Sequence, residues 1–449
     1  MTKVITYGTY DMLHYGHIRL LERAKALGDY LIVGVTADDF DKIRGKINVR
    51  QSLMERLEAV RATGIADEII VEEYEGQKID DIKRYGVDLF TVGSDWLGKF
   101  DYLEEYCKVV YLDRTEGVSS SKIRAHERST RLGLVGETTI LQKYFNESTY
   151  VNGVKITCIC SNDKNVLDIY KKKSIKVTQQ FNVLLQEVDA VYIGSHPSKH
   201  YLQVKEALLN NKHVLCESPI ALKLEECSEL FKIAKERNLI LMDAIKTAYS
   251  TAYNRLLLLL KGGIIGQIIS VDSTCTSLKG YISEKDVKIN QTWNSICGWG
   301  PTGMLPILQI LGANPVSYNI NSLFLGEDKN FDLFTKIDFS YPNAVASMKV
   351  GKGVKSEGEL VISGTKGYIY VPAPWWKTDY FEARYENQEN NKRFFYQLDG
   401  EGIRYEIVAF LKSLENGDYN SYIKTEISES IVFIIENFIN KKNLRHINI

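Results

Sequence analysis

The chain has 449 residues, 44% of them hydrophobic, and a formal net charge of −1 at pH 7. This length predicts about two to four domains, each with its own core. A net charge near zero, with both signs interspersed, argues against the strongly basic surface that nucleic-acid or anionic-membrane binding requires.

The cysteines and the N-terminal residues narrow the class of protein further. Seven cysteines without a CxxC pair indicate neither a disulfide framework nor a structural zinc site. They favour a reducing, cytoplasmic environment. The first residues, MTKVITYG, lack the pattern of a signal peptide, and the apolar run at 256–260 ends at Lys261, so we expect no membrane span.

Residues 1–125 alternate short apolar runs with segments of helical periodicity. We expect strands at 3–8, 30–36, 68–74, 89–95 and 108–113, with helices between them. Strands that alternate with helices are typical of a parallel sheet covered by helices on both faces. The sequence therefore predicts an α/β domain at 1–128.

The remaining residues predict two more domains. A polar stretch at 124–130 is typical of a linker, and the alternation of strand and helix begins again at 131 and continues to about 246. From 267 to 374 the apolar runs are longer and have little helix between them, which is typical of a mainly antiparallel sheet. Residues 401–440 return to helical spacing. We therefore expect an α/β domain at 131–247 and an α+β domain at 248–449.

The turn after the first expected strand contains the sequence GTYDMLHYGH at 8–17. In a parallel α/β sheet, ligands bind beyond the carboxyl ends of the strands, where a helix N-terminus favours anions. The spacing of His14 and His17 places both imidazoles on one face of that helix, and Gly16 leaves room for a phosphate. Two alternatives stay open here: the histidines cap or pack the helix, or they belong to a metal site that has no third ligand nearby.

A second segment, RTEGVSSSKIR at 114–124, follows the last expected strand of this domain. Gly117 permits a tight turn. Ser119, Ser120 and Ser121 offer hydroxyl and N–H groups at a helix start, and Arg114 offers a cation for a phosphate oxygen. A Ser-rich helix start alone is usually only a cap. Two anion-binding helix starts in one parallel sheet favour a polyphosphate site.

Together the two segments resemble the HxGH nucleotidyltransferases of the cytidylyltransferase family, and the resemblance covers nearly all of residues 1–125. It implies a Rossmann-like fold and transfer of CMP from CTP, with Mg²⁺, to a polyol phosphate, with glycerol 3-phosphate the expected acceptor. The products would be CDP-glycerol and pyrophosphate. No covalent enzyme intermediate is expected, because the acceptor phosphate attacks the α-phosphorus in line. Catalysis would then rest on positioning and charge stabilisation.

The resemblance also assigns site residues. The expected catalytic residues are His14, His17, Lys46 and Arg114. The expected CTP-binding residues are Thr9, Tyr10, Asp11, His14, Gly16, His17, Arg44, Asp95, Trp96, Arg114, Thr115, Glu116, Gly117, Val118, Ser119, Ser120 and Ser121. The expected substrate-binding residues are Lys46, Lys78 and Arg56.

Several of these residues also have simpler interpretations. Asp11 could cap the first helix, Trp96 could belong to the core, and each lysine alone could be a solvated surface charge. Arg44 stands where the family often carries a lysine, which keeps the charge but changes its shape. Gly64 stands where the family has a basic residue, and Arg61 one turn earlier is the candidate replacement.

Segments at 131–140, 190–220 and 244–274 resemble the Gfo/Idh/MocA family of nicotinamide-dependent oxidoreductases. This resemblance spans 131–449. It implies a second Rossmann-like domain followed by an α+β domain with an antiparallel sheet.

The residues on which activity depends in that family are altered here. At the dinucleotide turn Gly136 is kept, but Glu137 adds a carboxylate that repels a diphosphate, and Thr138 adds bulk. The family's Glu-Lys-Pro is replaced by Glu217-Ser218-Pro219, which lacks the lysine charge. Thr302 stands where the family presents a His or Tyr as proton donor.

We therefore expect a degenerate dinucleotide site, comprising Gly136, Ser161, His200 and Glu217, in a module without hydride transfer. Three hypotheses follow. The first is a cytidylyltransferase joined to a non-catalytic module. The second is a bifunctional enzyme whose second half binds NAD(P) and acts on the polyol phosphate or a related sugar. The third is a scaffold for surface-glycan assembly with a vestigial transferase. The resemblances further imply a homodimer and a role in surface-glycan or teichoic-acid-like polymer synthesis.

Overall fold

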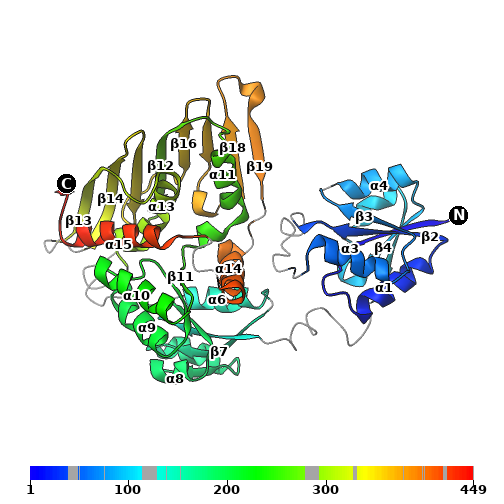
Figure 1. Ribbon diagram of the computed structural model, residues 1–449, viewed down its shortest axis with the longest axis horizontal. Coiled ribbons are helices and arrows are strands. Elements are labelled where there is room, and N and C mark those ends of the chain that lie inside the picture. Colours follow the sequence, from blue (N-terminus) through cyan, green and yellow to red (C-terminus); the bar gives the residue numbers. More distant parts are fainter. Residues whose placement is uncertain are drawn as a thin grey trace. The chain divides into compact units, whose positions relative to one another are not determined.

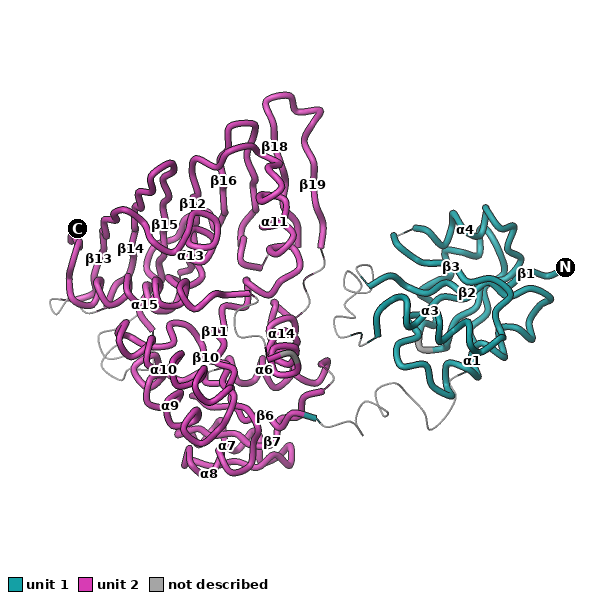
Figure 2. The backbone as a smooth tube through the Cα atoms, viewed as in Figure 1, with its two compact units in different colours: residues 1–129 teal, residues 130–449 magenta. Residues whose placement is uncertain are grey.

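The computed structural model describes the chain in two compact units, residues 1–129 and 130–449 (Figure 2). The described residues are 1–38, 49, 51–74, 76–113, 129–137, 139–151, 153–278, 293–326, 331–377, 379–396, 398, 400–417 and 422–447. None of the helices in these ranges combines the length and the apolar character needed to cross a membrane.

The first unit is a five-stranded parallel sheet with the strand order β3-β2-β1-β4-β5. The strands are β1 (Lys3–Gly8), β2 (Tyr30–Thr36), β3 (Glu68–Glu72), β4 (Leu89–Gly93) and β5 (Lys108–Leu112). The helices are α1 (Tyr15–Lys25), α3 (Leu53–Ala62) and α4 (Gln77–Tyr85), with short 3₁₀ turns η1 (Ser94–Trp96) and η2 (Asp101–Glu105).

Both faces of this sheet are buried. On β1, Val4 packs with Leu21 of α1 and Val60 of α3, whereas the next residue, Ile5, packs with Ile82 of α4 on the opposite face. The alternation follows from the two-residue period of a strand. Figure 1 shows α1 and α3 on one side of the sheet and α4 on the other. The predicted α/β fold of this domain is confirmed.

The second unit contains a six-stranded parallel sheet with the order β11-β10-β9-β6-β7-β8. Its strands are β6 (Thr130–Val135), β7 (Val154–Cys160), β8 (Lys176–Thr178), β9 (Ala190–Ile193), β10 (His213–Cys216) and β11 (Leu241–Asp243). Its helices are α6 (Ile140–Ser148), α7 (Lys164–Lys171), α8 (Phe181–Leu185), α9 (Pro197–Leu209) and α10 (Leu224–Glu236).

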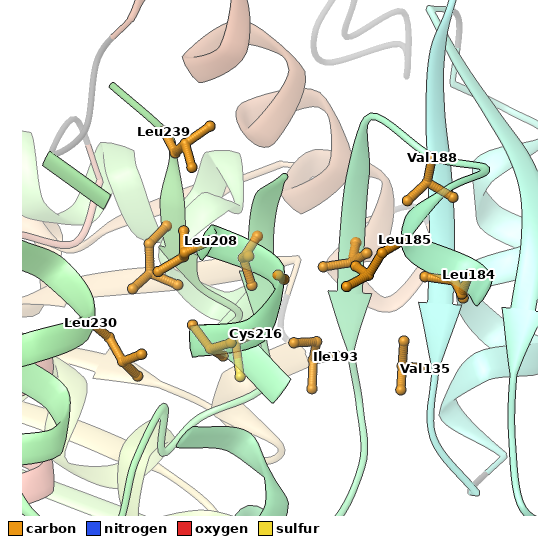
Figure 3. Packing of buried hydrophobic residues seen from close by; sticks show 14 of the residues in the cluster. Val135, Leu184, Leu185, Val188, Ile193, Leu208, Cys216, Leu230 and Leu239 are labelled. Carbon is orange, nitrogen blue, oxygen red and sulfur yellow. The ribbon is translucent and has the colours of Figure 1, made fainter. Parts of the chain in front are cut away.

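The core of this sheet is apolar and continuous. Figure 3 shows Ile193 and Cys216 of the central strands facing Leu184, Leu208 and Leu230 of the covering helices. These strands are buried on both faces, so they appear in the sequence as unbroken apolar runs. The second Rossmann-like domain expected from the sequence is therefore present.

A nine-stranded mixed sheet completes the second unit, with the order β19-β18-β17-β16-β12-β15-β14-β13-β20. Its strands are β12 (Ile268–Thr276), β13 (Ser317–Leu325), β14 (Phe331–Ser340), β15 (Val345–Gly351), β16 (Leu360–Gly364), β17 (Tyr368–Val371), β18 (Tyr380–Arg384), β19 (Lys392–Phe395) and β20 (Leu444–His446). Among the described strand pairs of this sheet, β12–β15 and β13–β20 are parallel and the others are antiparallel. The mainly antiparallel α+β region is thus confirmed.

Helices join the two sheets of the second unit. The remaining helices are α11 (Thr251–Lys261), α13 (Ser295–Leu311), α14 (Ile403–Asn416) and α15 (Thr425–Ile439), with 3₁₀ turns η3 (Lys246–Tyr249), η4 (Trp375–Lys377), η5 (Gln388–Asn390) and η6 (Gly400–Gly402). Helix α13 lies on the large sheet, α15 packs against both α13 and α10, and α14 packs against α6 (Figure 1). The expected boundary at 247/248 falls within η3 and stays a prediction.

Candidate active site

The turn between β1 and α1 brings His14 and His17 together. Helix α1 begins at Tyr15, and His14 is its N-cap, with Nδ1 accepting a hydrogen bond of 3.0 Å from the backbone N–H of Gly16. The two imidazoles are stacked, with ring centroids 3.9 Å apart and planes inclined by 19°. Because Nδ1 of His14 accepts the cap bond, the proton of the neutral ring resides on Nε2. The predicted pairing of the histidines on one face is confirmed, and His14 is also a helix cap.

The residues before this pair form an unusual turn. Tyr10 and Met12 have φ angles of 53° and 50°, in the left-handed region that residues other than glycine rarely adopt. The Tyr10 ring is buried and lies 5.6 Å from the His17 ring, edge to face. Burial raises the pKa of the Tyr10 phenol. The turn is therefore fixed by packing directly behind the histidine pair.

Gln51 ties this turn to the segment before α3. Its side chain Oε1 accepts a hydrogen bond of 2.7 Å from the N–H of Met12, and its own N–H donates to Asp11 Oδ1 at 3.0 Å. The alternative interpretation that Asp11 caps the first helix is wrong, because His14 occupies that position. Asp11 instead holds the two segments together.

Arg56 lies wholly buried beneath the same turn. Its Nη1 donates to the carbonyl oxygens of Thr9 and Thr36 at 2.7 and 2.8 Å, and its Nη2 forms an ion pair with Asp38. The guanidinium thus connects α3 to the carboxyl ends of β1 and β2. Its predicted role in substrate binding stays a prediction, since the contacts described here are with the protein itself.

Lys78, in the first turn of α4, is also buried. Its ammonium group forms an ion pair with Glu72, the last residue of β3, and lies 4.7 Å from the centre of the Tyr7 ring. Glu72 Oε2 accepts a further hydrogen bond of 2.9 Å from the hydroxyl of Thr36. Lys78 is therefore a buried, paired charge at the carboxyl edge of the sheet. The interpretation of Lys78 as a solvated surface lysine is wrong.

A second layer of polar contacts supports this lysine. The Tyr7 hydroxyl donates to Asp81 at 2.8 Å, and Gln77 Nε2 donates to the same carboxylate oxygen at 3.0 Å. Burial and the neighbouring Asp81 raise the pKa of the Tyr7 phenol, so it stays a donor. The Tyr7 ring lies directly over Gly34 of β2, where any side chain would overlap it.

Other predicted residues lie at the margins of this site or beyond it. Trp96 contacts Phe100, with ring centroids 5.8 Å apart, as its interpretation as a core residue predicts. Gly64 has a left-handed φ of 66°, and Arg61 pairs with Glu58 on the exposed face of α3. The predicted residues that lie outside the described part of the chain are Arg44, Lys46, Arg114, Thr115, Glu116, Gly117, Val118, Ser119, Ser120 and Ser121, together with the side chain of Asp95.

The second unit has its own turn at the carboxyl end of β6. Gly136 has a φ of 149°, and a Cβ atom there would lie 2.7 Å from the carbonyl oxygen of Gly194. The next residue, Glu137, accepts an ion-paired hydrogen bond of 2.9 Å from Lys199 and a hydrogen bond of 3.3 Å from Asn162. A carboxylate fixed by two partners therefore stands at this turn. Thr138 lies outside the described residues.

The loops after the neighbouring strands are buried and polar. Glu217 accepts a hydrogen bond of 2.6 Å from the Tyr192 hydroxyl, and burial raises the pKa of its carboxyl to about 7. Both ring nitrogens of His200 lie 2.8 Å from carbonyl oxygens, those of Ser195 and Pro219, and burial lowers its pKa to about 4. His200 is therefore a structural residue that links α9 to the loop after β10.

Ser161 and Thr302 are two further positions of the second unit that the sequence singled out. Ser161 is buried after β7, and its hydroxyl oxygen accepts a hydrogen bond of 3.2 Å from the N–H of Asp163. Thr302 lies half-buried on α13. Within the described ranges, no group of three or more His, Cys, Asp or Glu side chains could hold a metal ion.

Comparison with known proteins bears on the first unit most directly. A family profile described as cytidylyltransferase-like matches residues 5–126. The glycerol-3-phosphate cytidylyltransferase of Bacillus spizizenii is 49% identical over 124 residues, which are 28% of this chain and 95% of that protein. The enzyme of the same name from Staphylococcus aureus is 50% identical over 127 residues, 28% of this chain and 93% of that protein.

The chain belongs to the glycerol-3-phosphate cytidylyltransferase family through its first unit. That unit is a nucleotidyltransferase domain, as the resemblance of the two motifs implied. The stacked histidines, Arg56 and Lys78 are thus features of the cytidylyltransferase unit.

The second unit has the fold of an oxidoreductase family. A profile described as an oxidoreductase family with an NAD-binding Rossmann fold matches residues 130–244. A 3-ketoreductase from Actinomadura kijaniata, solved with NADP and TDP-benzene, superposes with a TM-score of 0.61 at 17% identity, covering 71% of this chain and 99% of that chain. At this identity the match shows the fold alone.

The described residues at the turn after β6 include a carboxylate, which opposes the binding of a diphosphate. A diphosphate requires donors and room at such a turn, and the described residues here present the Glu137 carboxylate, held by Lys199 and Asn162.

Sequence reasoning missed several residues that the structure brings to these sites. Glu72 holds Lys78, Gln51 holds the turn between β1 and α1, and Lys199 neutralises Glu137. Each is an ordinary polar residue in its local segment, and only its contact partner shows its role. A signal was available for Glu72 alone, because a carboxylate at the end of an otherwise apolar buried strand requires a partner.

Proposed function

We propose that the first unit transfers CMP from CTP to a polyol phosphate, with glycerol 3-phosphate the preferred acceptor. The observation that supports this most strongly is the stacked His14–His17 pair at the N-terminus of α1, at the carboxyl edge of a parallel sheet. The relatives that match over nearly their whole length are named glycerol-3-phosphate cytidylyltransferases. The products are CDP-glycerol and pyrophosphate.

The proposed chemistry is a direct in-line displacement. An oxygen of the acceptor phosphate forms a bond to the α-phosphorus of CTP, and the bond from that phosphorus to the β-phosphate bridge oxygen breaks. Negative charge grows on the equatorial oxygens and on the leaving pyrophosphate. The imidazole N–H groups of His14 and His17, with the N–H groups of the first turn of α1, stabilise that charge. Mg²⁺, when bound with CTP, would offset part of the negative charge of the triphosphate.

Lys78 is the described cation proposed to hold the acceptor phosphate. Its pairing with Glu72 and its place beside Tyr7 fix the ammonium group at the carboxyl edge before any substrate binds. A charge that is already fixed in place needs no rearrangement during the reaction. Its contribution is therefore to position the acceptor phosphate and not to form a covalent bond. Lys46 and Arg114, outside the described residues, are proposed to complete the phosphate contacts.

We propose that the second unit is a non-catalytic module and that the protein acts as a homodimer. Glu137, held at the turn after β6, supports the first part of this proposal. The product, an activated polyol phosphate, suits enzymes that build surface-glycan or teichoic-acid-like polymers. The alternative is an active NAD(P)-dependent oxidoreductase, which the fold of the second unit favours.

An acceptor panel tests the transferase proposal. The full chain is incubated with CTP, Mg²⁺ and, in turn, glycerol 3-phosphate, ribitol 5-phosphate, erythritol 4-phosphate and ethanolamine phosphate, and pyrophosphate release is measured. We expect release that depends on the acceptor and is fastest with glycerol 3-phosphate. Silence with every acceptor would contradict the transferase and favour the scaffold hypothesis.

A cofactor titration tests the second unit separately. NADH and NADPH are added to the full chain, and their fluorescence is followed. We expect no saturable change attributable to the nicotinamide ring, because of the carboxylate at the β6 turn. Micromolar binding accompanied by reduction of a sugar substrate would establish the bifunctional alternative.

A further inference from the structure

Three lysines of the second unit converge on a single carboxylate. The Glu401 carboxylate lies 2.7 Å from Lys143 Nζ, 2.9 Å from Lys377 Nζ and 3.6 Å from Lys246 Nζ. We refer to Lys143, Lys246 and Lys377 as the lysine triad. The three lysines come from α6, η3 and η4, so they are distant in sequence and only the fold brings them together.

The triad lies at the carboxyl edge of the β6–β11 sheet. Lys143 is in α6, which follows the turn after β6, and Lys246 follows β11. Glu401 lies in η6, directly before α14, and α14 packs against α6 and η3. The exposed side-chain fractions are 49% for Lys143, 26% for Lys246, 33% for Lys377 and 39% for Glu401, so a small solute can reach the group.

The charges of this group are not balanced by Glu401. Burial alone would raise the pKa of the Glu401 carboxyl. The hydrogen bonds to Lys143 and Lys377 oppose this effect, and the pKa is lowered to about 2. Burial, followed by the neighbouring Lys377, lowers the pKa of the Lys246 ammonium. Glu217 is the other carboxylate that acts on Lys246, and it is buried and hydrogen-bonded by Tyr192. Among the described residues, three cations therefore face one accessible singly charged anion.

Such a group suits an anion with a higher charge than a carboxylate. A phosphate monoester carries nearly two charges at neutral pH and has three terminal oxygens, one for each ammonium group. Glu401 supplies only two oxygens and one charge. Its side chain is partly exposed, so it can leave the triad by side-chain rotation without unfolding α14.

We propose that the lysine triad is a binding site for the phosphate monoester group of a small molecule, and that Glu401 is a tethered competitor which the ligand displaces. The site is built from residues of the second unit, and it does not depend on transferase activity. The phosphate monoester is either that of a sugar or polyol phosphate or the 2′-phosphate of NADPH, and these two sources are separated by the experiment.

Amine-directed footprinting of the full chain tests the site directly. The protein is labelled with a lysine-reactive acyl reagent at increasing concentrations of inorganic phosphate, and labelling of each lysine is read by mass spectrometry. We expect saturable protection of all three triad lysines together. Glycerol 3-phosphate, NADPH and NADH are then compared. Protection by glycerol 3-phosphate assigns a free phosphate ester, and protection by NADPH but not by NADH assigns the dinucleotide 2′-phosphate.

Two variants separate a binding site from a structural ion-pair cluster. Glu401→Gln removes the competitor, so half-protection by phosphate should occur at a concentration about fivefold lower than in the unmodified chain. Lys246→Gln removes one donor and should weaken protection of Lys143 and Lys377 by about tenfold. Glu187→Gln, which breaks the comparably exposed pair between Glu187 and Lys176 at 2.7 Å, is the matched control and should change neither value.

Protection that is strengthened by Glu401→Gln and weakened by Lys246→Gln supports the site. No protection of the triad in either the unmodified chain or Glu401→Gln, or equal protection in both, overturns it. Because the reading is local to these lysines, an inactive transferase would leave the result unaffected.

Discussion

His14 has two physically separable tasks in the first unit. Its Nδ1 accepts the cap hydrogen bond of α1, and its ring stacks on that of His17. A cap stabilises the fold, whereas an imidazole N–H aimed at a phosphate lowers the barrier to reaction. Replacement of His14 by an apolar residue removes both, so the choice of substitution decides what an experiment measures.

Asparagine separates these tasks. Asn caps helices well, so His14→Asn should retain the stability of the unmodified chain within about 0.5 kcal/mol. We expect kcat to fall by about 10²–10³, because the shorter amide cannot place an N–H where the imidazole Nε2–H lies. His14→Ala should show the same loss of kcat and also lose about 1 kcal/mol of stability. Pyrophosphate release and chemical denaturation measure the two effects. Full activity in His14→Asn would show that His14 is only a cap.

His17→Ala is the companion variant. The side-chain cap of α1 is made by His14, so for His17→Ala we expect a similar loss of kcat with little change in the free energy of unfolding. A variant that loses stability but keeps kcat would contradict the assigned role.

Glu217 predicts a pH dependence of stability in the second unit. Its folded pKa of about 7 lies above the ordinary value of 4.5 because of burial. The native state therefore holds the proton more tightly than the unfolded state, and this contribution is complete below about pH 4.5 and lost as pH rises to about 7. Its size is about 3 kcal/mol.

The measurement compares the unmodified chain with Glu217→Gln by denaturant unfolding from pH 4.5 to 8. The difference in unfolding free energy should shift in favour of the glutamine variant as pH rises. The comparison cancels His200, whose folded pKa of about 4 acts in the opposite direction over part of this range. A difference that stays constant with pH would contradict the raised pKa of the buried Glu217 carboxyl.

At the scale of secondary-structure elements, single buried cations connect helices to strands in the first unit. Lys78 joins α4 to the end of β3 through Glu72, and Arg56 joins α3 to β1 and β2 through backbone carbonyls. A helix attached in this way keeps its first turn in register with the carboxyl edge of the sheet. Loss of either cation therefore affects the shape of the site as well as its charge.

Lys78→Met should lower stability by about 3 kcal/mol, because Glu72 is left buried without its cation. Adding Glu72→Gln to that variant should restore part of the loss, since the buried carboxylate is then gone. Activity should stay low in both variants, because neither holds the acceptor phosphate. Unfolding and the KM for glycerol 3-phosphate are measured together. An additive loss of stability in the double variant would show that the two side chains do not act as a pair.

The elements themselves were largely predictable, and the contacts between them were not. The apolar runs of β1 and β9 and the periodicity of α9 follow from burial on both faces of a parallel sheet, and they are visible in any short window of sequence. The His14–His17 pair was predictable for the same reason, since its spacing is local. The substrate-binding role of Arg56 stays a prediction, whereas its burial under the β1–α1 turn could not be predicted because it depends on the whole sheet.

The lysine triad shows this limit most clearly. Lys143 and Glu401 are 258 positions apart, and neither stands in a distinctive segment. Similarly, the sequence predicts a carboxylate, Glu137, at the turn after β6, but only the structure shows that Lys199 pairs with it. Charge pairs between distant elements have no periodicity, so no window of sequence contains their signal.

The chain contains two compact units that match different protein families. One retains the histidine pair of a nucleotidyltransferase, and the other retains a Rossmann-like sheet whose dinucleotide turn carries a carboxylate. The two units should therefore respond to different ligands. A ligand that binds only the native form of one unit raises the unfolding temperature of that unit.

Calorimetry of the full chain tests this division. CTP with Mg²⁺ at about one hundred times its Kd should stabilise one transition by about 2.7 kcal/mol and leave the remaining heat absorption unchanged. His17→Ala should reduce the shift, because a phosphate contact is lost. A uniform shift of the entire profile by CTP would show that the units unfold as one cooperative body.

Phosphorus NMR of the full chain with CTP, Mg²⁺ and glycerol 3-phosphate tests the central claim most directly. The spectrum follows both substrates and both products at once. We expect equal amounts of CDP-glycerol and pyrophosphate, formed at the expense of both substrates, and no such signals with His17→Ala over the same time. Unchanged CTP, or pyrophosphate released without CDP-glycerol, would contradict that claim.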